Sequence, residues 1–432
     1  MATCKKAFGM TTSIFPPEME QFELQILRSA LAELGGDINT NLQDPQARGK
    51  VQITSFLLAH LLGRQGVAHE YGSMAAEVAA LQKAEQDEQQ ILAAKPVAQD
   101  STSAITAEIL TPYVRSKLND PKVTVTSLQA SLGGYSKQTF ILTLSGAEHL
   151  GNKLVMRRDQ VGGPVESQTA DEFDIIKLML GRGVPVPEPL WADRHPPFGG
   201  TCMLMRLVLG NTAYDVTGIM IGSDGKEAAL ALARVLGKIH QTPVSALNLS
   251  SELANASLGD HVRRMVKYYE DHWLRRRVGN SPTLTAAFAW LKANVPDNAL
   301  PVLVHGDASL RNLLVHDGKA SAMLDWELWH VGDHNEDLAY CRNDVEQFVP
   351  WEAFLSEYRS AGGLAFDARA GEYYAIFGAL RNAVFADACL HSFVTAPIPE
   401  PKLAYGALAG GRKLICMIAS QLAKLKYQNV GG

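Results

Sequence analysis

Apolar positions recur with a helical period at the start of the chain. Between residues 17 and 94, apolar side chains return every three or four positions, as in the run over residues 22–34. This spacing is typical of amphipathic helices, and it predicts a helical extension over residues 1–95. The polar stretch KPVAQDSTS follows at residues 95–103 and indicates a domain boundary.

The pattern then changes to one typical of strands. Ser103 is placed to cap a helix over residues 104–118. Short apolar runs after this helix predict strands near residues 123–125, 139–144, 153–157 and 201–209. One further helix is expected within this region, over residues 166–180. Residues 104–210 are therefore predicted to form a β-rich domain.

The remaining residues, 211–432, are mainly helical in pattern. An amphipathic helix is expected over residues 227–240. Three short apolar runs, the last two around a turn, interrupt the helices at residues 301–325. The whole chain thus predicts an α+β protein with a small β-rich part, a larger helical part and an N-terminal helical extension.

Composition narrows the class of protein. Hydrophobic residues make up 47% of the chain and charged residues 20%, which is ordinary for a globular core. The net charge of −5 gives no electrostatic case for a nucleic-acid or membrane partner. The five cysteines include no C-x-x-C pair, and no segment has the pattern of a signal peptide or a membrane span. We expect a cytoplasmic protein with reduced thiols.

Candidate chemistry gathers around the interrupted stretch. His305, Gly306 and Asp307 follow one apolar run, Asn312 precedes the next, and Asp325 ends the third. In phosphoryl transfer, one carboxylate takes the proton of the attacking hydroxyl, while an amide and a second carboxylate hold magnesium. The alternative is that these Asp and Asn residues only form turns, which is their commonest role.

The motifs HGDxxxxN, LDWE and GDHNEDLA resemble those of the aminoglycoside phosphotransferase-like (choline kinase-like) small-molecule kinases. They are similar to the kinase-like domains related to those fused to acyl-CoA dehydrogenases. The resemblance begins near Ser103 and continues to the C-terminus. It implies a two-lobed protein kinase-like fold, with an N-lobe over residues 104–210 and a C-lobe over residues 211–432. It also implies Asp307 as the catalytic base, with Asn312 and Asp325 as magnesium ligands.

The resemblance assigns nucleotide contacts to the β-rich lobe. Gly133, Gly134 and Ser136 match a GGxS turn that covers the phosphates in this family. Arg157 stands where kinases carry a phosphate-binding lysine, and either Arg157 or its neighbour Arg158 could make the contact. We favour Arg157, because Val155 would then share its face toward the adenine.

Three further assignments complete the expected site. Glu172 is expected to pair with Arg157, as the helix glutamate pairs with the strand lysine in kinases. The main chain at Met205 and Leu207 is expected to contact the adenine. Glu327 could add a contact in the metal shell, because this branch has Asp-Trp-Glu where protein kinases have Asp-Phe-Gly. Asp333 and Asp337, in contrast, are expected to be structural.

The leading function is a magnesium-dependent O-phosphotransferase that uses ATP or GTP and acts on a small-molecule hydroxyl. A hydroxyacyl-CoA or another apolar metabolite is the favoured acceptor, and an aminoglycoside or macrolide antibiotic is the alternative. A protein kinase is disfavoured, because no Ala-Pro-Glu follows Asp325. A nucleotide-binding regulator or scaffold without turnover is the non-enzymatic alternative.

The sequence leaves the role of two further segments undecided. The helices of residues 1–95 could form a homodimer or a wall of the substrate pocket. A run of basic residues could face an anionic substrate or could be a solvated helix face; it comprises Arg263, Arg264, Lys267, Arg275, Arg276 and Arg277.

Overall fold

The computed structural model describes residues 105–130, 136–160, 163–213, 225–297, 299–395 and 401–430. The predicted helical extension over residues 1–95, with the dimer contact suggested for it, lies outside these ranges. Within them, none of the helices combines the length and the apolar character needed to cross a membrane.

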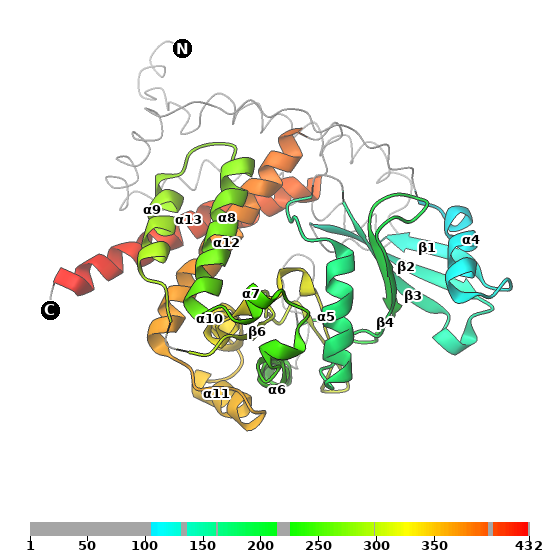
Figure 1. Ribbon diagram of the computed structural model, residues 1–432, viewed down its shortest axis with the longest axis horizontal. Coiled ribbons are helices and arrows are strands. Elements are labelled where there is room, and N and C mark those ends of the chain that lie inside the picture. Colours follow the sequence, from blue (N-terminus) through cyan, green and yellow to red (C-terminus); the bar gives the residue numbers. More distant parts are fainter. Residues whose placement is uncertain are drawn as a thin grey trace, which may run out of the picture.

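The N-terminal part is a five-stranded antiparallel sheet flanked by two helices (Figure 1). The strand order is β1-β2-β3-β5-β4. The strands are β1 (Thr124–Ala130), β2 (Lys137–Ser145), β3 (Lys153–Asp159), β4 (Pro189–Asp193) and β5 (Cys202–Arg206). Helix α4 (Ala107–Leu118) packs on one face, and α5 (Thr169–Gly181) lies between the sheet and the helical part of the molecule (Figure 1).

Side-chain alternation along β3 separates the two faces of this sheet. Leu154 and Met156 are fully buried in the core shared with α4. Val155, on the opposite face, packs against the core shared by α5 and the helical lobe. Because successive side chains of a strand point to opposite faces, Arg157 lies on the side of α5. The fold therefore directs Arg157 toward the second lobe.

Both flanking helices begin three residues later than the sequence pattern predicts. Helix α4 begins at Ala107, and the Thr106 hydroxyl accepts a hydrogen bond from Ile109 N at 3.4 Å, so Thr106 takes the capping role expected of Ser103. Helix α5 begins at Thr169, whose N–H donates to Asp159 Oδ1 at 2.9 Å. These polar contacts set the first turns, which apolar spacing alone does not locate.

The C-terminal part is helical and carries two small antiparallel pairs of strands, β6 with β9 and β7 with β8. Its strands are β6 (Val302–Val304), β7 (Leu313–His316), β8 (Lys319–Met323) and β9 (His330–Gly332). Its helices are α6 (Gly225–His240), α7 (Ser251–Ala254), α8 (Leu258–Arg276), α9 (Pro282–Ala293), α10 (His334–Val345), α11 (Trp351–Ser360), α12 (Ala368–Thr395) and α13 (Pro401–Val430). The predicted division into a β-rich lobe and a larger helical lobe is present.

Candidate active site

The loop after β6, residues 305–312, is the catalytic loop of the proposed site. Gly306 has φ +82°, and a Cβ atom there would lie 2.3 Å from the carbonyl oxygen of Leu328. Glycine is required on both counts, because other residues rarely adopt this φ and the neighbouring backbone leaves no space. The tight approach places Asp307 beside the segment that follows Asp325.

Asp337 fixes the start of the catalytic loop from beneath. Its buried carboxylate accepts hydrogen bonds from His305 N at 2.8 Å and from Gly306 N at 2.9 Å. It also contacts His240 Nε2 at 3.1 Å. Burial acts to raise the pKa of Asp337, but these hydrogen bonds outweigh it and the pKa is lowered. The carboxylate therefore stays charged and acts as an anchor, the structural role expected of it.

His305 joins the two loops that carry the candidate carboxylates. Its Nδ1 accepts from Asp307 N at 3.2 Å, so its proton lies on Nε2, which donates to Leu324 O at 3.0 Å. Burial lowers the pKa of this imidazole, in keeping with the neutral form. The edge of Trp326 packs against the ring, with centroids 4.6 Å apart. His305 thereby sets the spacing between Asp307 and Asp325.

Asn312 contacts Asp307 directly. Its amide nitrogen donates to Asp307 Oδ2 at 2.6 Å and to Asp307 O at 2.9 Å. Its backbone carbonyl accepts from Leu324 N at 2.7 Å, next to Asp325. Asp325 itself adopts φ +64°, a conformation uncommon for a residue with a side chain. The structure thus brings the three predicted catalytic and metal residues together.

Arg157 links the two lobes. Its Nη1 contacts Glu172 Oε2 at 2.9 Å, so the predicted pair is present. Its Nη2 contacts Asp325 Oδ1 at 2.8 Å, and Glu327 Oε2 lies 3.9 Å away. Burial acts to lower the pKa of Arg157, but the three carboxylates outweigh it and the pKa is raised.

Arg158 points away from this site. It donates to the backbone carbonyl oxygens of Phe198 and Gly199 at 2.9 and 2.8 Å. Of the two arginines left open by the sequence, Arg157 is the one whose side chain reaches the candidate site.

Ser136 and Glu327 form a second contact between the lobes. The Ser136 hydroxyl lies 2.6 and 2.8 Å from the two carboxylate oxygens of Glu327. We call Ser136, Arg157, Glu172, Asp325 and Glu327 the interlobe clamp. Gly133 and Gly134, the other residues of the predicted phosphate turn, lie outside the described residues.

Negative charge exceeds positive charge in this region. Burial, with the charge of Asp325 as a further cause, raises the pKa of Glu327 to about 8 and that of Asp307 to about 6. Burial also raises the pKa of Glu172 to about 7, against the opposing effect of Arg157. A site whose carboxylates resist ionisation in this way favours the arrival of a cation.

The residues present fit a magnesium ion. Asn312 uses its amide nitrogen on Asp307, which leaves its side-chain oxygen for a cation, and Asp325 supplies carboxylate oxygen. Such hard oxygen donors suit magnesium, which usually takes one or two carboxylates and completes its shell with phosphates and water. Within the described ranges no group of three or more acidic, histidine or cysteine side chains forms a self-contained metal cage. Ligands from a nucleotide would be needed to complete the shell.

The expected adenine contacts lie at the end of β5. Met205 is buried and pairs with Val155 of β3 and Pro189 of β4, and Leu207 follows the last residue of the strand. Both residues lie at the junction between the lobes, where the chain leaves the sheet.

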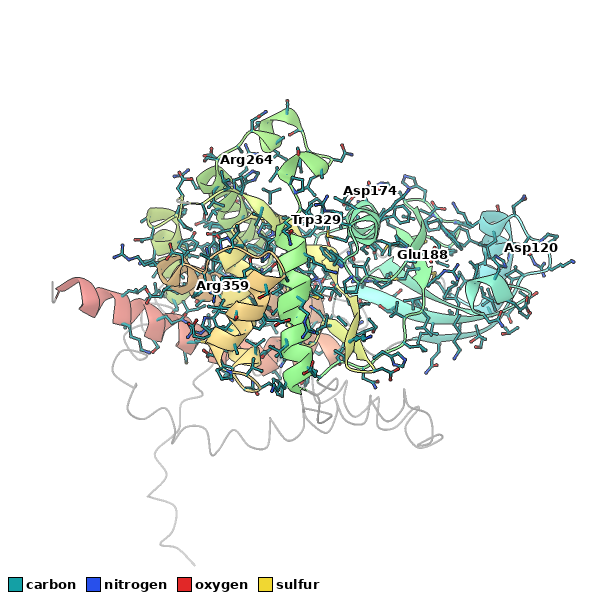
Figure 2. The ribbon with its side chains drawn as sticks, turned by 90° about the horizontal axis from the view of Figure 1, so that it is seen from below. Asp120, Asp174, Glu188, Arg264, Trp329 and Arg359 are labelled. Atoms are coloured by element: carbon teal, nitrogen blue, oxygen red, sulfur yellow. The ribbon has the colours of Figure 1, made fainter. Side chains whose placement is uncertain are left out.

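The basic residues of α8, and Arg277 directly after its end, have neighbouring partners. Arg263, Lys267 and Arg264 pair with Asp260, Asp271 and Glu252, and Arg264 lies at the outer edge of the helical lobe (Figure 2). Arg275 pairs with Glu166, Arg276 donates to Gly163 O and Ser392 Oγ, and Arg277 stacks on Trp273. These contacts favour the structural interpretation of the run over an anion site.

Sequence reasoning missed three residues close to Asp307. Tyr340 of α10 and Arg381 of α12 act to lower the pKa of Asp307, and the charge of Asp307 raises the pKa of Tyr269 in α8. They are far from the catalytic motif in the sequence, and motif spacing cannot predict which distant residues will lie near Asp307.

Residues 127–374, more than half of the chain, match the model of the phosphotransferase enzyme family. The chain belongs to this family. The kinase-type enzyme class expected from the sequence is thereby confirmed.

Three curated proteins are similar to part of this chain. Acyl-CoA dehydrogenase family member 10 of mouse is 30% identical over 245 residues, 55% of this chain and 22% of that protein. Family member 11 of chicken is 26% identical over 236 residues, 53% of this chain and 29% of that protein. The chain thus spans less than a third of these two relatives. Aminoglycoside 3'-phosphotransferase of Escherichia coli is 29% identical over 192 residues, 44% of this chain and 68% of that protein.

Among solved structures, one similar chain is a putative aminoglycoside phosphotransferase from Ralstonia eutropha. Its TM-score is 0.53 at 19% identity, with 73% of this chain and 98% of that chain covered. This likeness confirms the predicted kinase-like fold of the family.

Proposed function

We propose that the protein is a magnesium-dependent O-phosphotransferase that moves a phosphoryl group from ATP or GTP to a small-molecule hydroxyl. The observation that carries this proposal is the meeting of Arg157 with Asp325 at 2.8 Å, beside an Asp307 held by Asn312 at 2.6 Å. Phosphoryl transfer depends on positioning and charge stabilisation, and these residue types supply both.

Each residue has a definite part in the proposed reaction. Asp307 orients the acceptor hydroxyl and takes its proton; a pKa of about 6 keeps the carboxylate ionised yet basic near neutral pH. Asn312 and Asp325 would hold magnesium, which when bound neutralises charge on the phosphates. Arg157 binds phosphate oxygens through its planar guanidinium, and Glu172 keeps it in place.

The nucleotide would lie between the lobes. Gly133, Gly134 and Ser136 would cover its phosphates, and the main chain near Met205 and Leu207 would bind its base. Ser136, the last residue of the turn proposed to cover the phosphates, hydrogen-bonds Glu327, which follows the proposed magnesium ligand Asp325 by two residues. Glu327 would then contribute from the periphery of the metal site.

For the acceptor, we favour a hydroxylated molecule that is not polycationic, such as a hydroxyacyl-CoA. The side chains that couple to Asp307 from α8, α10 and α12 are Tyr269, Tyr340 and Arg381, which are neutral or cationic. A polycationic aminoglycoside would favour acidic groups there. The two relatives named as acyl-CoA dehydrogenase family members support the first class, and the E. coli relative supports an aminoglycoside.

The test compares wild type with Asp307→Asn, using ATP and GTP with magnesium and panels of hydroxyacyl-CoAs, hydroxy acids, aminoglycosides and macrolides. We expect transfer to fall by about 10³-fold in Asp307→Asn, as for loss of a general base. Nucleotide binding, measured by calorimetry, should persist in the variant. Asp271→Asn, which removes an exposed carboxylate from an ion pair on α8, is the matched control.

Two outcomes would contradict the proposal. Nucleotide binding without Asp307-dependent transfer or hydrolysis would favour the regulator or scaffold. Aminoglycoside transfer faster than transfer to any hydroxyacyl-CoA or hydroxy acid would overturn the acceptor class and leave the enzyme class in place.

A further inference from the structure

A short segment before α5 reaches from the β-rich lobe to the helical lobe (Figure 1). It comprises residues 163–168, and we call it the strap. Its C-terminal end is fixed to the sheet, because the buried Lys137 ammonium donates to Ser167 O and contacts Asp159 Oδ1 at 3.0 Å. Thr169 N donates to the same Asp159 oxygen at 2.9 Å. This end of the strap therefore belongs to the β-rich lobe.

The other end of the strap is held by α8 of the helical lobe. Arg276 Nη2 donates to Gly163 O at 2.8 Å and to Ser392 Oγ of α12 at 2.8 Å. Arg275 pairs with Glu166 of the strap at 2.8 Å, but both of these side chains are largely exposed. An exposed ion pair contributes little, whereas Arg276 is half-buried and Gly163 is buried. The bond from Arg276 to Gly163 is therefore the main hold.

Gly163 packs directly on Ser136. A Cβ atom at Gly163 would lie 3.0 Å from Ser136 O, closer than an ordinary contact. The φ of Gly163 is not positive, so this close approach accounts for the glycine, and its conformation does not. The hydroxyl of Ser136 in turn bonds Glu327 at 2.6 Å. A continuous series of contacts thus joins α8, through Arg276 and Gly163, to the end of the predicted phosphate turn.

The strap lies at the phosphate end of the proposed nucleotide site. In the pairing of β3 with β5, Arg158 lies opposite Cys202 and Leu154 lies opposite Arg206. The chain leaves β3 toward the strap at the end where β5 begins, and it leaves β5 toward the expected base contacts at the opposite end. The four residue steps between these pairs correspond to about 13 Å. The strap is therefore placed to influence phosphates and not the base.

We propose that Arg276 is a positioning residue for the phosphate turn: through Gly163 it holds the strap against Ser136 and keeps Ser136 on Glu327. The inference rests on the proposed function, because it takes Ser136 to cover the phosphates of a nucleotide. It makes α8 of the helical lobe a determinant of phosphate binding. Arg276 acts through the backbone of the strap and does not itself bind the nucleotide.

Gly163→Ala tests the contact between the strap and the phosphate turn. The added methyl group must displace Ser136 O, so nucleotide phosphates lose part of their cover. We expect the calorimetric Kd for ATP or GTP with magnesium to rise about tenfold, within the usual cost of an added methyl group in filled space. Adenosine and guanosine, which have no phosphates, serve as reference ligands in competition calorimetry. Their Kd values should stay within about twofold of wild type.

Gly279→Ala is the matched control for this variant. Gly279 lies in the loop after α8 and also has no positive φ, but a Cβ there would have no atom within 4 Å. It gains the same methyl group without a contact to displace. Its Kd values for nucleotides and nucleosides should equal those of wild type.

Arg276→Met tests the hold from α8, because it keeps an unbranched side chain and removes the donors. The Kd for ATP or GTP should rise about fivefold, the scale of one lost hydrogen bond, with the nucleoside Kd unchanged. Arg263→Met is its control, since Arg263 is an exposed residue of the same helix and pairs with Asp260 within α8. Combined with Gly163→Ala, Arg276→Met should add less than its own fivefold effect. Full multiplication of the two losses would overturn the proposed series of contacts.

The remaining outcomes separate this inference from the proposed function. Nucleotide binding that Gly163→Ala leaves unchanged or tightens overturns the inference and spares the proposed function. Equal weakening of nucleotide and nucleoside binding overturns it in favour of a general structural role. Wild-type protein that binds neither ATP nor GTP overturns the proposed function, and this inference with it.

Discussion

The catalytic loop and the interlobe clamp hold their charges in different ways. At the start of the catalytic loop, Asp337 of α10 accepts two backbone N–H groups and contacts His240, all within the helical lobe. In the clamp, Arg157 and Ser136 come from the β-rich lobe, and Asp325 and Glu327 come from the helical lobe. The Asp337 carboxylate has donors on both of its oxygens, while in the clamp three carboxylates surround the single guanidinium of Arg157.

This difference suggests a division of labour in the proposed enzyme. A base must point in one direction before the substrate arrives, so its loop gains from a buried network that is already satisfied. A site for magnesium and phosphates binds them more tightly when its charged groups are not yet fully paired within the protein. The raised pKa values of Glu172 and Glu327 express that incomplete balance.

The largest expected effect comes from breaking the anchor of the catalytic loop. Asp337→Ala leaves the N–H groups of His305 and Gly306 without their acceptor, as well as removing the partner of His240. The free energy of unfolding in urea should fall by about 3–5 kcal/mol. Asp271→Ala, which removes an exposed carboxylate paired with Lys267, should change it by less than about 0.5 kcal/mol. Similar losses in both variants would contradict the contrast between the regions.

A smaller effect is expected from the backbone of the same loop. Gly306 and Gly151 have nearly equal φ angles, +82° and +81°, but a Cβ at Gly151 would have no atom within 4 Å. Gly151→Ala should therefore cost only about 1 kcal/mol, from the left-handed conformation. Gly306→Ala should cost about 2 kcal/mol more, because its Cβ meets Leu328 O. Equal unfolding midpoints for the two variants would show that the backbone near Leu328 can shift to make room for the added Cβ.

The smallest effect concerns the charge balance of the clamp. With a pKa raised from 4.5 to about 8, Glu327 binds more protons in the native state than in the unfolded state between those pH values. The free energy of unfolding should therefore fall as pH rises through this window in the absence of magnesium and nucleotide. Glu327→Gln removes this titration, so the variant should melt about 3 °C above wild type at pH 8, with the gap closing toward pH 5.

The control for this experiment is Glu252→Gln, at an exposed carboxylate paired with Arg264. Its melting temperature should follow that of wild type at every pH. If Glu327→Gln also followed wild type, the excess of buried carboxylates in the clamp would have no measurable cost.

Much of the site could be predicted from local sequence. The interval from Asp307 to Asn312 places both side chains in one loop, and their contact at 2.6 Å follows. The two-residue period of a strand favoured Arg157 over Arg158, and the sheet directs them to opposite faces. Helix starts were less predictable, because they depend on a few polar contacts, the Thr106 cap of α4 and the bonds from Thr169 of α5 to Asp159.

Contacts between distant elements could not be predicted in this way. Ser136 and Glu327 are 191 residues apart, and their hydrogen bond depends on how the lobes close. The basic run of α8 left two interpretations open, and the acids that pair with it decide between them, Glu166 among them from outside the helical lobe. The guanidinium of Arg381 lies over the ring of Tyr340, 4.6 Å from its centroid, only because α10 and α12 pack side by side.

By itself, the sequence determined the two kinds of lobe, the order of the motifs and the side chains able to perform phosphoryl transfer. These depend on periodicity and on short spacings, which act within a few residues of the chain. Only the tertiary structure decided which charges are paired, which carboxylates resist ionisation and which distant residues contact one another. Those properties depend on burial and on contacts between elements, because desolvation and neighbouring charges act through space.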